Sequence, residues 1–420
     1  MIKKSSINIF ILFVLYSNSS YGAFSNYNSI LIGDLVAGMG GAGTAVIGDV
    51  AASPFYNPAT LGQLNASAFS AAVGIHKKLD IMYGEENDFA KASMKVSEGY
   101  FRSLPSSVGS AIKYKDWILA LTIIVPDYIN FKGDLFNKSN NTTTLSYVDQ
   151  SLWTGGSVGK KISETESIGF TAYYTARNYE RSISDRSFPS ATKATLFSSE
   201  STKTDNSLIL IFGYFRQLND KWASGISVRP RSMKIAGKST IFESTTQVDT
   251  AVPTLTQVTV NEPAGSSDTI IPGKLAIGVS YNPDPTWLLS ADANFYEELS
   301  YEDTDRQSSS ILVRHKPVFN MQLGGEHRLF PWLKLRGGVY TDFSSHPEPH
   351  EINRLQDDHV DMYGFSANFV FIAGNKIAYT FGGYYTGGKG LSRQRINQKF
   401  ETITKSQNIF SMLMGTAFYF

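Results

Sequence analysis

The chain of 420 residues contains no cysteine. This absence excludes disulfides and thiolate metal sites, and it does not indicate a cellular compartment. Net charge is also nearly absent, because 38 Lys and Arg stand against 37 Asp and Glu, for a formal value of +1. Nothing in this balance favours a polyanion as partner, so we expect no nucleic-acid binding.

Long apolar runs are missing from most of the chain, whereas a membrane helix needs about 20 such residues. The main apolar run, residues 7–16, follows Lys3 and Lys4 and precedes the small residues Ser20 and Gly22. This order is typical of a secretory signal peptide, and we predict that residues 1–22 are removed, with an uncleaved anchor as the alternative. The mature protein is therefore expected to be exported without a transmembrane helix.

Alternation of apolar with polar or small residues recurs through most of the remaining sequence. At the end of the chain, Phe410, Met412 and Met414 fall on one face of an extended segment, and Ser411 and Ala417 on the other. Residues 319–328 and 333–343 show the same period. Such segments are predicted strands with one apolar and one polar face.

A soluble sandwich would also alternate, but three features favour a membrane barrel. The segments reach about ten residues, the length of a tilted strand across a bilayer. Tryptophans cluster near strand ends, as in an interfacial girdle. The predicted inner faces carry charged residues, as a wet lumen would: Asp292, Glu326, Arg328, Lys334 and Arg336.

Connections between the predicted strands alternate in length. Short turns occur at 114–117, 162–167, 217–222, 282–287, 329–332 and 372–376. Long polar loops occur near 78–105, 128–148, 181–204, 237–268, 300–310, 345–358 and 387–404. Six short turns and seven long loops predict an all-β, 14-stranded antiparallel transmembrane barrel in the outer membrane of a Gram-negative cell, with the short turns in the periplasm.

The block between the predicted cleavage site and the first strand carries only two charges, at Asp34 and Asp49. A disordered tail avoids apolar composition, so this block is expected to fold against something. We predict a hatch at 23–64 that plugs the lumen of a barrel formed by 65–420. An extra strand or a partner-docking arm are the alternatives.

Three motifs resemble known binding or catalytic motifs but lack the secondary structure in which those motifs function. Gly38, Gly40 and Gly43 match a dinucleotide fingerprint, but no βαβ unit follows. Ser157 stands in a G-x-S-x-G frame inside an alternating strand, where a nucleophile elbow does not form.

The third motif is the segment HPEPH, in which Pro347 and Pro349 prevent His346 and His350 from sharing a helix face. A solvated loop is the expected state of this segment and of nearby DDHVD. We therefore expect no catalytic residue, no metal and no cofactor, and hence no enzyme.

The run GDLVAGMGGAGTAVIGDVAASPFYNPATL resembles the start of FadL-type outer-membrane transporters, the family that carries long-chain fatty acids and other hydrophobic compounds. Further stretches resemble the strand pairs of that family, among them SVGSAIKYKDWILALTIIVP and EHRLFPWLKLRGGVYTDFSSHPEP. The match covers essentially the whole mature chain, with the long loops least similar. Thr60 departs from the family pattern, in which a small residue follows Asn-Pro-Ala.

The resemblance implies a 14-stranded barrel with a hatch and a sideways exit at a kink in the third strand. By position, the hatch turn beside this lateral gate is Asn57, Pro58 and Ala59. The third strand corresponds to 117–125, which gives the candidate gate residues Trp117, Leu119, Leu121, Ile123 and Val125. The aromatic terminus, Phe418 and Phe420, resembles the signal read by the barrel-assembly machinery.

The function implied is passive transport of hydrophobic small molecules, with long-chain fatty acids expected, by lateral release through the wall into the lipid of the outer membrane. The partners expected are the hydrophobic ligand, membrane lipid and, during biogenesis, the assembly machinery, with the protein a monomer. A surface receptor or adhesin displaying long loops, and a general porin, are the alternatives.

Overall fold

The computed structural model describes residues 25–84, 94–100, 104–136, 142–251, 254–306, 309–350, 356–374, 376–396 and 399–420. The predicted signal peptide lies outside these ranges. Helices are short in the described chain: α1 (Leu35–Gly38), α2 (Ser53–Tyr56) and the 3₁₀ helix η1 (Pro58–Gln63). None of them has the length or apolar content to reach across a bilayer.

Strands make up nearly all the rest of the described chain. They are β1 (Ala68–Tyr83), β2 (Met94–Tyr100), β3 (Leu104–Tyr114), β4 (Trp117–Phe136), β5 (Thr142–Lys161), β6 (Glu166–Ser190), β7 (Lys193–Gln217), β8 (Trp222–Arg229), β9 (Met233–Asp249), β10 (Thr254–Gly265), β11 (Lys274–Tyr281), β12 (Trp287–Tyr296), β13 (Leu299–Arg306), β14 (Ser309–His315), β15 (Val318–Phe330), β16 (Leu333–Asp342), β17 (Gln356–Ala373), β18 (Ile377–Ile396) and β19 (Lys399–Tyr419).

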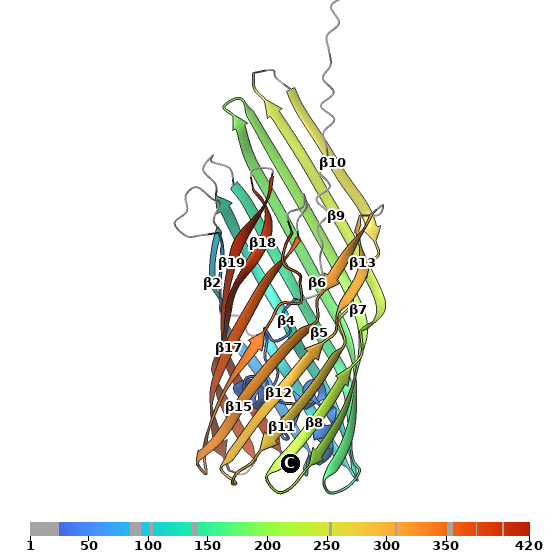
Figure 1. Ribbon diagram of the computed structural model, residues 1–420, viewed down its shortest axis with the longest axis vertical. Coiled ribbons are helices and arrows are strands. Elements are labelled where there is room, and N and C mark those ends of the chain that lie inside the picture. Colours follow the sequence, from blue (N-terminus) through green and yellow to red (C-terminus); the bar gives the residue numbers. More distant parts are fainter. Residues whose placement is uncertain are drawn as a thin grey trace, which may run out of the picture.

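These strands close into a barrel (Figure 1). The first strand, β1, pairs antiparallel with the last, β19, from Ala68 opposite Tyr419 to Tyr83 opposite Lys405. Both β2 and β3 pair with β1, both β8 and β9 pair with β7, and β10 and β11 continue the next position along the wall. The 17 strands of the main sheet therefore fill fourteen wall positions, as predicted. The hairpin β13–β14 forms a sheet of its own.

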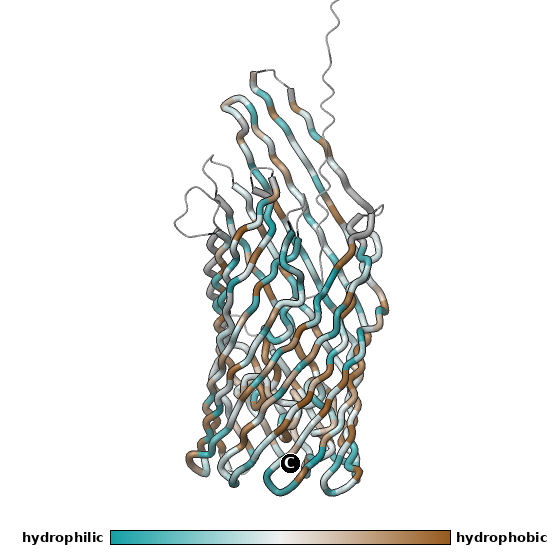
Figure 2. Tube along the Cα trace, viewed as in Figure 1, coloured by the Kyte–Doolittle hydropathy of each residue, from teal (hydrophilic) through white to brown (hydrophobic). Residues whose placement is uncertain are grey.

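The two faces of the wall differ as the alternation predicts. On β15, Phe319 and Met321 are 52% and 49% exposed on the outside, whereas Asn320 and Gln322 are 0% and 2% exposed toward the lumen. Figure 2 shows apolar and polar residues following one another along the strands. Because the apolar side chains face outward, the surrounding medium of this wall is hydrocarbon.

The short turns gather at the end of the barrel where the C-terminus lies (Figure 1). Trp117, Trp222 and Trp287 each open a strand directly after such a turn, and Trp332 stands in the turn between β15 and β16. All four are 41–53% exposed. Their place at one rim agrees with the predicted aromatic girdle.

The long polar connections differ from the loops predicted from the sequence. Most are antiparallel ribbons, since β6 and β7 stay paired to Ser190 opposite Lys193, and β9 and β10 to Asp249 opposite Thr254. In Figure 1 these ribbons rise far beyond the rest of the wall. The physical reason is that Thr, Val, Ile and Tyr favour strands even where both faces are solvated, and a polar composition alone does not end a ladder.

Residues 25–64, which we call the inner segment, lie inside the lower half of the barrel (Figure 1). Helix α1 contacts β16, β17 and β18, while η1 contacts β5, β6 and β7. The segment therefore touches both sides of the wall. Nearly all of its residues from Asn28 to Leu64 are buried.

Candidate functional site

Asn57 is fully buried and joins the inner segment to the wall. Its amide nitrogen donates hydrogen bonds to the carbonyl oxygen of Thr44, at 2.7 Å, and to that of Tyr214 in β7, at 3.1 Å. Its side-chain oxygen accepts the backbone N–H of Ala59 at 3.1 Å and so caps η1. The amide thus uses both its donor and its acceptor end, which fixes the turn in one orientation.

The wall is shaped to admit this turn. At Gly169 in β6 a Cβ atom would lie 2.2 Å from the backbone of the turn, and at Gly213 in β7 it would lie 2.1 Å from Oδ1 of Asn57. Ser167 in β6 also donates a hydrogen bond to the carbonyl oxygen of Ala59, at 2.7 Å. Because these two glycines have no side chain, the backbone of the turn approaches the backbone of the wall closely. The turn therefore fits against β6 and β7 in one position.

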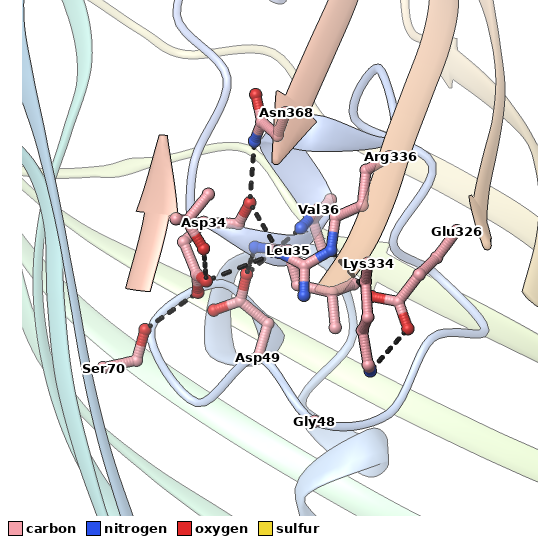
Figure 3. A network of polar contacts seen from close by, with 12 residues as sticks. Asp34, Leu35, Val36, Gly48, Asp49, Ser70, Glu326, Lys334, Arg336 and Asn368 are labelled. Carbon is pink, nitrogen blue, oxygen red and sulfur yellow. Dashed lines mark hydrogen bonds and ion pairs between the residues drawn. The ribbon is translucent and has the colours of Figure 1, made fainter. Parts of the chain in front are cut away.

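A charged network holds the other side of the inner segment (Figure 3). Asp34 accepts a hydrogen bond from Thr380 at 2.8 Å, and Nη1 of Arg336 lies 3.5 Å from the same carboxylate. Nε of Arg336 donates to Glu326 at 2.7 Å, and Glu326 also binds Lys334 at 2.6 Å. Since Asp34 and Arg336 are almost fully buried, each depends on the other for compensation of its charge.

Asp49 organises the inner segment from within (Figure 3). Its Oδ2 accepts the backbone N–H groups of Leu35 at 3.0 Å and Val36 at 3.2 Å, and its Oδ1 accepts that of Ala52 at 3.1 Å. Burial, reinforced by the nearby charge of Asp34, raises the pKa of Asp49 from 3.8 to about 7. This group therefore changes charge near neutral pH.

Two wall carboxylates bind the backbone of the same segment. Asp292 in β12 accepts the N–H groups of Gly43 at 2.9 Å and Thr44 at 2.8 Å. Asp342 at the end of β16 accepts the N–H of Asn28 at 2.8 Å. The wall thus satisfies backbone donors that an irregular buried segment would otherwise leave unpaired.

The ladder between β3 and β4 ends part of the way up the wall. The last pair is Ser107 opposite Ile124. On its other edge, β4 shifts register against β5 between Ile124 and Asp127, around Pro126, which has no N–H to donate. Further up, β2 contacts β4, but within the described ranges no ladder joins β4 to β2 or β3 above Ile124. In the described chain the hydrogen-bonded ladder is therefore interrupted beside Pro126.

A pocket in the lumen lies directly inside this interruption. Tyr27 stacks on Tyr296 with ring centres 4.2 Å apart, and Phe55 meets Trp153 edge-on at 5.7 Å. Its lining residues come from the inner segment, from five wall strands and from the stretch before β11: Tyr27, Phe55, Pro126, Asp127, Ser151, Trp153, Thr175, Arg177, Arg229, Ile271 and Tyr296. The walls are mainly aromatic, with a few polar groups between them, as small-molecule sites are.

One cation, Arg229 of β8, lines this pocket, and a second, Lys274, occupies the paired position on β11. Arg229 is 7% exposed, and its guanidinium carbon lies 5.7 Å from the ring centre of Trp153 and 5.9 Å from that of Tyr296. Lys274 places Nζ 5.7 Å from the ring centre of Tyr296 and near both aromatic rings of α2. Nε of Arg229 has no hydrogen-bond partner, and in the described part of the chain no carboxylate forms an ion pair with Arg229. A buried cation with an unused donor suits an anionic or polar head group.

A second pocket lies further toward the open end of the barrel. One side of it is apolar, with Ile129 and Phe131 of β4 among its residues. The other side carries Asp358, which accepts hydrogen bonds from Lys405 at 2.7 Å and Tyr83 at 3.0 Å. Strands β4 and β5 contribute to the lining of both pockets, so the two pockets lie one above the other along the same strands.

The candidate gate strand corresponds to β4, the third wall position. Four of the predicted gate side chains face outward to the membrane, since Trp117, Leu119, Leu121 and Ile123 are 41%, 52%, 69% and 44% exposed, and Val125 is half-buried. The residues that alternate with these four along β4 are buried and face the lumen.

The turn at Asn57, Pro58 and Ala59 lies against β6 and β7. Two later residues of the inner segment, Leu61 and Leu64, share an apolar cluster with Ile118 and Ala120 of β4.

Sequence reasoning did not find Asp127 or Arg229. A proline in an otherwise alternating strand is confined to edges and bulges, so Pro126 was a readable signal for the interruption. No comparable signal distinguishes Arg229 from Arg231 two residues later.

The remaining sequence motifs have structural roles. Gly40 has a φ of +67° and lies against the backbone of β16, where a Cβ atom would come within 3.0 Å of Val339 N. Ser157 shares a hydrogen bond of 2.8 Å with Thr171 inside the wall. No group of His, Asp and Glu in the described ranges is arranged as a metal site. Phe420 is 72% exposed at the rim, while Phe418 packs against Phe69 with ring centres 6.2 Å apart; their role in assembly stays a prediction.

The closed fourteen-position barrel, apolar outside and occupied inside by its own N-terminal segment, defines an outer-membrane β-barrel protein. No protein-family model matches the chain, and no curated protein does. Among solved structures, the chain is similar to a FadL homologue of Pseudomonas aeruginosa, with a TM-score of 0.66 and 13% identity over 94% of this chain and 99% of that one.

Two toluene transporters are similar as well. TodX of Pseudomonas putida has a TM-score of 0.61 and 12% identity over 94% of this chain and 99% of that one. TbuX of Ralstonia pickettii has a TM-score of 0.60 and 13% identity over 93% and 98%. At these identities the likeness establishes the fold, which is that of FadL-type outer-membrane transporters.

Proposed function

We propose that this protein carries hydrophobic small molecules, with fatty-acid-like compounds as the main class, passively across the outer membrane and releases them sideways beside Pro126. The observation that carries the proposal is the position of the aromatic pocket. It opens directly inside the place where the β3–β4 ladder ends, and it holds a buried cation with an unused donor.

The energetics of an apolar ligand favour such a route. Each buried CH₂ group is worth about 0.8 kcal/mol, so a long alkyl chain is held poorly by a water-filled channel. The two pockets along β4 and β5 keep apolar surface covered on the way to the lipid. The inner segment acts as a hatch that stops water-soluble solutes from leaking through the lumen.

Arg229 gives the aromatic pocket a preference for ligands that carry a head group. A carboxylate placed beside its guanidinium would accept charge-assisted hydrogen bonds, while the alkyl chain lies against Trp153 and Phe55. The solved relatives named as toluene transporters carry a ligand without a head group, so the aromatic walls suit hydrocarbons too. We therefore expect fatty acids to bind more tightly than hydrocarbons of similar size.

Uptake of labelled oleate tests this proposal in a strain that lacks other fatty-acid transporters. Expression of the wild-type protein should raise uptake, and Arg229→Met should lower it. Arg231→Met is the matched control, because Arg231 is exposed and pairs with Glu297 at 2.6 Å. Equal uptake with and without the protein would reject the proposal.

A surface receptor or adhesin is the second candidate, favoured by the β-ribbons that rise beyond the wall. Cells that gain binding to another protein or cell, with no gain in oleate uptake, would support that function. A general porin would instead show large steady single-channel currents.

A further inference from the structure

Asp127 stands in the lateral route without an evident structural reason. It is the first residue of β4 to pair with β5 after the register shift, and it follows Pro126 directly. Its side chain lines the aromatic pocket and accepts one hydrogen bond, from Ser151 at 3.0 Å. In the described chain no Lys, Arg or His forms an ion pair with it.

The charges of Arg177 and Arg229, which line the same pocket, act on Asp127 without an ion pair to it. Arg177, which lines the same pocket, binds Asp149 through two hydrogen bonds of 2.8 Å and 2.7 Å. Keeping a carboxylate between aromatic walls and a bilayer is costly, and an ionisable residue at membrane depth is a functional candidate by default. We therefore expect Asp127 to act on the molecules that pass it rather than to stabilise the fold.

We propose that Asp127 is the charge-selecting residue of the lateral exit, which lets neutral head groups pass and holds back head groups that stay anionic. The inference rests on the lateral release proposed above and deepens it by naming the chemical class that can leave. Arg229 attracts an anionic head into the pocket, whereas Asp127 repels the same head at the opening. Discrimination by such a like-charge contact is a common source of specificity.

The consequence for the substrate differs between chemical classes. A hydrocarbon or an alcohol passes Asp127 without electrostatic cost. A carboxylic acid passes after it has taken up a proton from water, and a second carboxylate nearby makes that protonation easier. An alkyl sulfate cannot be neutralised in this way, so it is captured and not released.

Two ligands of equal chain length test the inference: labelled dodecanol and labelled dodecyl sulfate, both below micellar concentration, given to intact cells that express the full chain. In wild type we expect dodecanol uptake to exceed dodecyl sulfate uptake by about tenfold. Asp127→Asn should raise the ratio of dodecyl sulfate uptake to dodecanol uptake several-fold. Asp134→Asn is the matched control, because Asp134 is an exposed carboxylate on the same strand.

The outcomes separate this inference from the proposed function. Equal uptake of both ligands by wild type, or an unchanged ratio in Asp127→Asn, would overturn the role of Asp127 while leaving transport intact. Uptake of neither ligand above that of cells without the protein would overturn the proposed function itself. Heat-modifiable migration shows whether Asp127→Asn is folded; if it is not, Asp127→Ser is measured in its place, and an unchanged ratio in that variant overturns the role of Asp127.

Discussion

The side-chain amide of Asn57 donates a hydrogen bond to the carbonyl oxygen of Tyr214, 3.1 Å away on β7. This bond connects the inner segment to the sixth wall position, whereas the interruption in the wall lies at the third. The anchor of the proposed hatch and the proposed lateral exit are thus separate parts of the barrel. Substitutions at Asn57 are therefore expected to raise ion leakage through the lumen more than they change release of the ligand.

Replacement of Asn57 by Ala should loosen the hatch and leave the barrel folded. The substitution leaves two carbonyl oxygens and one N–H without their partner, at a cost of about 1–3 kcal/mol. Ion conductance of the purified protein should rise, while its heat-modifiable migration stays unchanged. Asn65→Ala at an exposed position should change neither, and loss of folding in Asn57→Ala would contradict the separate anchor.

Adding one methyl group at Gly169 should displace the same turn. The new Cβ would lie 2.2 Å from its backbone, closer than any real contact allows. Gly156→Ala is the matched control on β5, because the nearest atom would be 3.8 Å away. We expect conductance to increase for Gly169→Ala alone; identical currents for the two variants would show that the turn does not fill the lumen.

Arg336→Met should destabilise the protein by about 3 kcal/mol, because Asp34 keeps its buried charge without a cation, whereas Glu326 retains Lys334. Adding Asp34→Asn should recover part of this loss, so the double variant costs less than the sum of the two single ones. Denaturant unfolding in detergent measures these free energies. Arg216→Met removes an exposed pair with Glu166 and should change stability by less than about 0.5 kcal/mol.

Docking of the inner segment should weaken as pH rises through about 7. The pKa of Asp49 in the folded protein, about 7, lies above its ordinary value of 3.8. The folded state therefore favours the protonated carboxyl. The stabilisation of docking that results is complete below pH 3.8, decreases as the pH rises and is lost above pH 7. Conductance should be higher at pH 8 than at pH 6, and Asp49→Asn should flatten the difference; a fall with pH would refute this sign.

Much of the fold was predictable because the bilayer imposes one period on the sequence. Residues such as Phe319 and Met321 have to face lipid when Asn320 and Gln322 face the lumen, and short turns fix how strands follow one another. The polar ribbons beyond the membrane were not predictable in this way. Both of their faces meet water, so no apolar stripe marks where a strand such as β9 ends.

The candidate site was less predictable than the wall. Arg229 and Arg231 flank the same proline, and only the folded barrel shows that one is buried against Trp153 while the other pairs with Glu297. The uncharged block around Asn57 predicted that this segment packs against another part of the protein. Neither the anchoring role of Asn57 nor its partner strand was predictable, because η1 and the glycines of β6 and β7 determine them through long-range packing.

Lateral release is the central claim, and a reversible cross-link across the interruption tests it most directly. Continuing the β3–β4 register by one step from Ser107 and Ile124 places Ser106 opposite Val125. The chain has no cysteine of its own, so Ser106→Cys with Val125→Cys can form a single defined disulfide.

The control pair is Ser110→Cys with Leu121→Cys, positions that are already opposite each other in the intact part of the ladder. Labelled oleate uptake is measured before and after reduction. We predict that uptake is lost in the oxidised Ser106–Val125 pair, returns on reduction, and is unaffected in the control pair. Full uptake through the oxidised Ser106–Val125 pair would contradict lateral release beside Pro126.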